Sequence, residues 1–117
     1  MSPFDTSILD AALAERKARN EVERQQVLAK TLRLLDELGP SYKIERAYVF
    51  GSIIKPGHFH ANSDVDIAVE QIDPLRFFEA MSEFFNRLER EVDLIELDKC
   101  HFAHRIREKG RLWERRT

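Results

Sequence analysis

The sequence predicts a single α/β domain in which a small mixed β-sheet is flanked by helices. A chain of 117 residues can bury one hydrophobic core, but it is too short for a catalytic domain and a separate substrate-binding domain. Segments with the apolar spacing of helices alternate along it with short apolar runs that are typical of strands. Hydrophobic residues make up 43% of the chain and charged residues 34%, as in soluble globular proteins. We expect one domain over residues 1–117.

The N-terminal segment, residues 1–38, is predicted to be helical. Apolar residues recur at helical spacing in its last part and stop at Gly39-Pro40. This pair of residues is typical of a helix end, so we expect the helix to end near Leu38.

The first part of this segment is less regular. Residues 8–13 form a short apolar stripe, and residues 15–26 are almost wholly polar. The helix could therefore continue or break near Asn20. A long polar helix buries little in its own domain, so the stripe could pack either on the core or on a partner protein.

Two strands separated by a loop are predicted next. Residues 46–50 are mainly apolar and run into the turn at Gly51-Ser52, and residues 53–63 contain Pro, Gly and Asn without any period. In residues 65–69 branched apolar side chains alternate with Asp66 and an alanine. Such a strand directs its carboxylates to one face and its branched residues to the other.

The rest of the chain predicts a helix, a strand and a short helix. Asp73-Pro74 is typical of a helix start, and the apolar face that follows consists of Phe77, Phe78, Met81, Phe84, Phe85 and Leu88. Residues 92–97 are predicted to form a third strand, and residues 100–109 a last helix. The C-terminal end is basic, with Arg105, Arg107, Lys109, Arg111, Arg115 and Arg116. It is interpreted as a solvated tail, with contact to RNA or to an acidic partner as the alternative and Trp113 as an exposed candidate anchor. We expect the sheet to carry acidic residues on one face and the helices on the other.

Composition and charge disfavour several classes of partner. The formal net charge of -2 provides no overall positive field for DNA or RNA, so nucleic acid is an unlikely partner in this interpretation. No apolar run approaches the roughly 20 residues of a membrane-spanning helix, and no membrane role is expected. The single cysteine, Cys100, cannot form an internal disulfide, and the N-terminus lacks the features of a signal peptide. We therefore expect a cytoplasmic protein.

Three aspartates form the candidate catalytic cluster. Asp64 and Asp66 lie two apart on a strand, so both carboxylates project from one face at a separation suited to a shared cation. Asp93 can join them if its strand pairs beside theirs. Two carboxylates about 4 Å apart repel by roughly 4 kcal/mol at the effective dielectric of a protein surface, and a divalent cation would offset this repulsion. Magnesium takes such oxygen ligands together with water and substrate phosphates.

The turn before the loop suits a phosphate group. Gly51 permits close approach of the backbone, and Ser52 offers a hydroxyl and an N–H donor. Together with the aspartates, this turn indicates a site for a metal-bound triphosphate.

A Gly-Ser turn after an apolar strand, a Ser-Asp-x-Asp segment leading a second strand and a lone Asp on a later strand resemble the DNA polymerase beta-like nucleotidyltransferase superfamily. The small size resembles its minimal nucleotidyltransferases, many of which are antitoxins paired with HEPN-domain toxins. The resemblance covers about residues 46–97, the expected catalytic core, and implies the nucleotidyltransferase fold. It implies a nucleotide-binding role for Gly51, Ser52, Lys55 and Ser63. It also implies that two Mg2+ ions are held by Asp64, Asp66 and Asp93. The loop before Asp64 is one residue longer than is usual in the family.

The resemblance also implies a function. The chain is expected to transfer AMP from ATP to a hydroxyl, that of a tyrosine, on a partner HEPN toxin and thereby to act as an antitoxin, with Asp93 as general base. A partner would supply the acceptor because the chain has no room for a second substrate-binding domain. Two alternatives stay open: an antitoxin that neutralises by binding alone, and a nucleotidyltransferase that modifies a small hydroxylated compound.

Overall fold

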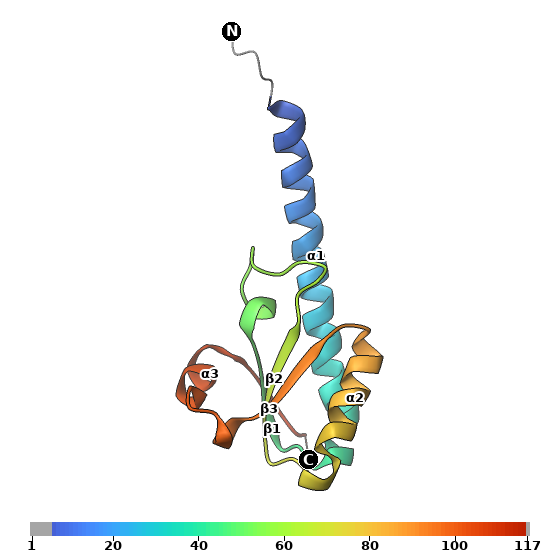
Figure 1. Ribbon diagram of the computed structural model, residues 1–117, viewed down its shortest axis with the longest axis vertical. Helices are drawn as coiled ribbons and strands as arrows, with labels where there is room; N and C mark the ends of the chain where they lie inside the picture. The colour runs from blue at the N-terminus through green and yellow to red at the C-terminus, as the bar shows by residue number, and fades with distance from the viewer. Residues whose placement is uncertain (1–5, 117) are drawn as a thin grey trace.

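The computed structural model describes residues 6–116 and confirms a single α/β domain with a mixed sheet (Figure 1). The helices and strands follow in the order α1 (Ser7–Leu38), β1 (Arg46–Phe50), β2 (Val65–Glu70), α2 (Phe77–Leu88), β3 (Val92–Glu96), α3 (Ala103–Lys109) and β4 (Arg111–Glu114). The strand order in the sheet is β3-β2-β1-β4. The pair β2 and β3 is parallel and is connected through α2, whereas β1 is antiparallel to both β2 and β4.

Helices cover both faces of the sheet, which differs from the expectation that all of them would pack opposite the acidic residues. The second half of α1 and α2 cover one face, and α3 lies across the other (Figure 1). The larger core, which contains Leu35, Ile67 and Phe84, lies under α1 and α2. The smaller one, built from Tyr48, Ala68, Leu97 and Ile106, lies under α3. Because neighbouring strand residues point to opposite faces, Asp66 and Ala68 share the α3 face.

Helix α1 is continuous and does not break at Asn20. Its last part buries Thr31, Leu34, Leu35 and Leu38 and ends, as predicted, before Gly39-Pro40. By contrast, residues 6–19 are all exposed, and this half projects away from the sheet (Figure 1). Its apolar stripe therefore does not rest on the core.

The C-terminal end is not a solvated tail, so the prediction for this segment was wrong. Residues 111–114 form the edge strand β4, and the Trp113 side chain is buried rather than exposed. The indole Nε1–H of Trp113 donates to Asp36 Oδ1 at 2.7 Å. A Cβ on Gly39 would come within 2.6 Å of the Trp113 ring, so the glycine that ends α1 also makes room for β4.

Other differences are local. Asp73 caps as predicted, accepting a hydrogen bond from the Leu75 backbone N–H, but it opens a short 3-10 turn before α2. On α2 the side chain of Phe84 is buried, whereas Phe78 is largely exposed. The last helix is shorter than predicted, since it begins at Ala103 and not at residue 100. The third strand ends at Glu96, one residue earlier than predicted, and a 3-10 turn over residues 97–99 follows it.

Within the described part of the chain, every helix is too short or too polar to cross a lipid bilayer.

Candidate active site

The aspartates lie where the start of β2 meets its two neighbouring strands. Asp64 immediately precedes β2, and Asp66 is its second residue. In the sheet register Asp66 is opposite Asp93 on β3 and opposite Phe50 on β1. The condition under which Asp93 would join the other two carboxylates, pairing of its strand beside β2, is therefore met.

The electrostatics of Asp66 show that it lies within reach of the negative charges of Asp93 and Asp64. Asp66 is partly buried, whereas Asp64 and Asp93 are exposed. Burial raises the pKa of Asp66 to about 6, with further increases from the negative charges of Asp93 and then Asp64. Since desolvation and like charges both disfavour the ionised form, a bound cation would be favoured at this position.

Gly51 brings the turn after β1 directly against Asp66. Its φ of +81° lies in the left-handed region, which favours glycine. A Cβ at this position would come within 2.2 Å of Asp66 Oδ2. Any side chain here would have to displace the carboxylate, so glycine is required for the turn and the aspartate to be neighbours. Ser52 follows in the 3-10 turn η2 (Gly51–Ile54) and is partly buried.

A hollow of about 640 Å³ opens beside this turn, between η2 and α3. Its walls are apolar at Phe50, Ile54, Phe102 and Ile106, and it is completed by Gly51 and three cationic residues, Lys55, Arg105 and Lys109. None of these three cations forms an ion pair with residues 6–116. An apolar wall with free cations suits a ligand that has both a ring system and several negative charges.

Two of these cations lie outside the site that the sequence predicts. Arg105 and Lys109 belong to the basic end of the chain, which the sequence indicates to be solvated. Their spacing of four residues on a helix places them on one face, and this is the only signal that could have grouped them. That the face borders the Gly51 turn depends on how α3 packs.

Ser63 has a local contact of its own. The side chain is buried, and its Oγ accepts a hydrogen bond from the His60 backbone N–H at 2.9 Å. This bond closes the end of the loop directly before Asp64. The nucleotide-binding role of Ser63 stays a prediction, as does that of Lys55, which borders the hollow.

The donor set fits magnesium better than a transition metal. Among residues 6–116, no group of three or more His, Cys, Asp or Glu side chains that could hold a metal ion is present, so the three aspartates do not form a complete ligand set without further ligands. Magnesium is usually bound by one or two carboxylates and completed by substrate phosphates and water. Asp66, with Asp64 and Asp93 beside it, offers carboxylate oxygens of that kind next to a hollow that could admit the phosphates.

Comparisons with known proteins agree with this geometry. The model of the family described as polymerase beta, nucleotidyltransferase matches residues 33–116. A crystal structure of a toxin-antitoxin with AMP-PNP is 29% identical, with a TM-score of 0.57, and the match covers 74% of this chain and 72% of that chain. A crystal structure of the toxin-antitoxin MntA-HepT is 26% identical, with a TM-score of 0.53 and coverage of 77% and 72%. No curated protein sequence matches the chain.

Proposed function

The chain belongs to the polymerase beta nucleotidyltransferase family, and from this premise we propose that it transfers AMP from ATP to a hydroxyl of a partner toxin. The observation that carries the proposal is that Gly51 lies directly against Asp66, which in turn is opposite Asp93 in the sheet register. It joins a phosphate-binding type of turn to a carboxylate cluster. The proposed role is that of an antitoxin in the cytoplasm.

The hollow supports ATP as the donor. The apolar side chains of Phe50, Phe102 and Ile106 provide a surface for the adenine ring. The cations at Lys55, Arg105 and Lys109 attract the triphosphate. We place the phosphates against the Gly51-Ser52 turn, whose backbone a phosphate can approach closely because no Cβ intervenes.

The proposed reaction is an in-line displacement. The oxygen of the acceptor hydroxyl forms a bond to the α-phosphorus of ATP, and the bond from that phosphorus to the oxygen bridging to the β-phosphorus breaks. Pyrophosphate leaves, and AMP remains on the acceptor as a phosphodiester. Asp93, exposed at the start of β3, receives the hydroxyl proton as general base.

Asp64, Asp66 and Asp93 would hold the two magnesium ions. When bound, magnesium neutralises charge that develops on the phosphates and on the attacking and leaving oxygens. The raised pKa of Asp66 supports this assignment, because a group that is hard to ionise alone is stabilised in its ionised form by a neighbouring cation.

The acceptor is proposed to be a tyrosine hydroxyl of a HEPN-type toxin. The similar solved structures are toxin-antitoxin complexes, and one of them was solved with AMP-PNP.

Incubation of the purified chain with magnesium, ATP and the product of its neighbouring gene tests this proposal. Label from the α-phosphate of ATP should appear in the partner protein and should be absent when Asp66→Asn replaces the parent. Label from the γ-phosphate would indicate a kinase and contradict the proposal. Tight binding and full neutralisation of the partner without any label would favour the antitoxin that acts by binding alone.

A further inference from the structure

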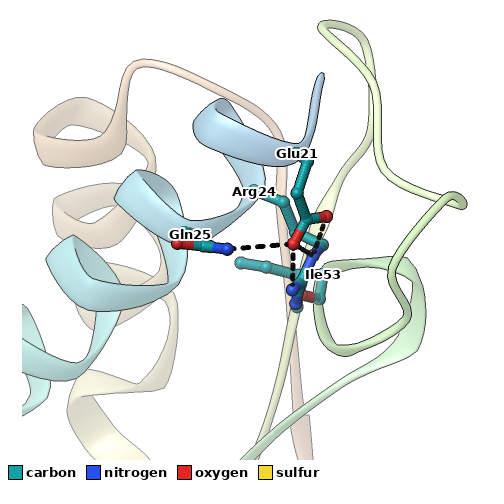
Figure 2. A network of polar contacts seen from close by, with 4 residues as sticks. All are labelled: Glu21, Arg24, Gln25 and Ile53. Atoms are coloured by element: carbon teal, nitrogen blue, oxygen red, sulfur yellow. Dashed lines mark hydrogen bonds and ion pairs between the residues drawn. The ribbon is translucent and has the colours of Figure 1, made fainter. Parts of the chain in front are cut away.

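The loop between Ser52 and Asp64 is held at its first end by Arg24 of α1. Arg24 Nη1 donates to the backbone carbonyl oxygen of Ile53 at 2.9 Å. Its Nε and Nη2 donate to the Glu21 carboxylate, which also accepts from Gln25 Nε2 (Figure 2). Only 12% of the Arg24 side chain is exposed. All three guanidinium nitrogens are thus engaged, so this arginine serves as a structural bridge and is not a free cation for a ligand.

The same loop is held at its other end by Arg90. Its Nη1 donates to the Ser63 carbonyl at 3.0 Å and its Nη2 to the Ala61 carbonyl at 3.0 Å. Nη2 also donates to Glu23 of α1 at 2.8 Å, and the guanidinium lies over the Phe59 ring. The Arg90 side chain is 11% exposed, so it too is committed to the protein.

Both arginines depend on one turn of α1. Glu21 and Glu23 each balance the charge of an arginine that binds a backbone carbonyl of the loop. The loop itself is mostly exposed over residues 55–62, with Phe59 as its buried residue. A loop that buries so little opens easily, so charge-assisted hydrogen bonds at its two ends would strongly restrict its position.

We infer that Arg24 and Arg90 are positioning residues that fix the two ends of the loop between Ser52 and Asp64. Arg24 positions the Gly51-Ser52 turn, which is proposed to bind phosphate, and Arg90 positions Asp64. The inference rests on the proposed function for the identity of the ligand. Arg24 acts through Ile53, the residue after Ser52, and Arg90 acts through Ser63, the residue before Asp64. Neither arginine lines the hollow that we assign to the nucleotide.

The effects of removing Arg24 and of removing Arg90 should be distinguishable. Removal of the Arg24 hydrogen bond to Ile53 should loosen the turn that receives the triphosphate and therefore weaken nucleotide binding. Removal of the Arg90 hydrogen bonds should displace Asp64 and therefore weaken the response to magnesium while leaving the turn in place. A merely structural role would lower stability in both variants without this division.

The test uses the full chain, with AMP-PNP and magnesium as probes. We expect Arg24→Met to weaken AMP-PNP binding about tenfold, which corresponds to the removal of one charge-assisted hydrogen bond. Arg90→Met should shift the magnesium concentration required for binding upward by a similar factor. Arg19→Met is the matched control, because Arg19 lies on the same helix in an exposed ion pair with Glu15, and it should change neither quantity.

Hydrogen exchange of residues 53–63 provides a readout that does not depend on catalysis. Exchange should become faster in Arg24→Met and Arg90→Met and stay unchanged in Arg19→Met. If the Met variants fail to fold, Arg24→Lys and Arg90→Lys keep the charge but cannot form the two-sided bridge, and they should show the same changes to a smaller degree. Unchanged exchange in a folded variant overturns the inference even if the parent transfers AMP. A parent that transfers no AMP, with exchange altered as expected, contradicts only the proposed function.

Discussion

On the face of the sheet covered by α1 and α2, side chains such as Val65, Ile67 and Val69 are fully buried. On the face reached by α3, β2 carries Asp66 and the neighbouring strand β3 carries Asp93. Residues adjacent in sequence thus have opposite effects on stability. Burial of apolar area stabilises the fold, whereas grouping of carboxylates destabilises it. The residues that stabilise the fold and the proposed catalytic residues lie on opposite faces of one sheet and not in separate domains. Substitutions on the acidic face should therefore lower activity without lowering stability, and substitutions on the other face should lower stability first.

The largest expected effect is on the acidic face. Changing Asp64 and Asp66 together to Asn keeps side-chain volume but removes the proposed metal ligands. Nucleotidyl transfer should fall by orders of magnitude, because electrostatic stabilisation is usually the largest catalytic contribution. Thermal stability should be equal to or above that of the parent, since the carboxylate repulsion is relieved. Transfer assays and melting curves on the same samples check both parts.

This double variant also separates catalysis from binding. Its affinity for the partner should survive, because the main core is untouched. If cells that express the proposed partner toxin remain fully protected by this variant at native expression, neutralisation is stoichiometric, and the proposed enzymatic role is wrong.

The opposite signature is expected on the main-core face. Phe84 of α2 is fully buried, and Phe84→Ala should lower the free energy of unfolding by about 3–5 kcal/mol through reduced burial and the cavity that remains. Denaturant titration measures this change. Any protein that still folds should keep measurable transfer, and complete inactivation of the folded fraction would mean that the two faces are not separable.

A smaller effect should sharpen the role of the α3 side. Replacing Arg105 and Lys109 with Gln should weaken AMP-PNP binding about tenfold for each charge-assisted hydrogen bond that is removed. The melting temperature should change little, because neither cation pairs within the described residues. Arg107→Gln is the matched control, since Arg107 lies on the same helix but is paired with Glu70. Equal weakening in the control would point to a general effect of charge.

The pH dependence of stability should carry the mark of Asp66. Its pKa is about 6 in the folded protein against an ordinary value of 3.8, so the folded state binds more protons between these values. The contribution of Asp66 to the free energy of unfolding is therefore fully present below about pH 4 and is lost as the pH rises to about 6. Allowing for its partial exposure to solvent, we expect about 1 kcal/mol. Urea titrations of the parent and Asp66→Asn across this range should diverge accordingly, and parallel curves would contradict the assignment.

The least effect on the fold is expected outside both faces, in the projecting half of α1. Leu9, Leu13 and Val22 are between 51% and 58% exposed, and residues 7–32 precede the part that matches the family. Changing all three to polar residues should leave the melting temperature within a few degrees, because they contribute nothing to the core. The same variant should weaken complex formation with the proposed partner toxin. A loss of stability instead would show that this half of the helix folds onto the domain.

The placement of Asp66 beside Gly51 and opposite Asp93 could largely be predicted from the sequence because its signals are local. The alternation around Asp66 and the glycine turn before the loop depend on neighbours within a few residues. The burial of Trp113 could not be predicted because its partner, Asp36, lies 77 residues away, and a four-residue edge strand rich in charge resembles a tail. The roles of Arg24 and Arg90 are hidden for the same reason, since each acts on a loop carbonyl that only the packed fold brings within reach.

The close approach of Gly51 to Asp66 offers a criterion for recognising related proteins that have lost this active-site geometry. A relative could retain every aspartate and still be inactive if position 51 had acquired a side chain, because any β-carbon there would collide with the carboxylate. Sorting related sequences by the residue at position 51 would separate chains that can keep this turn beside the aspartate from chains that cannot.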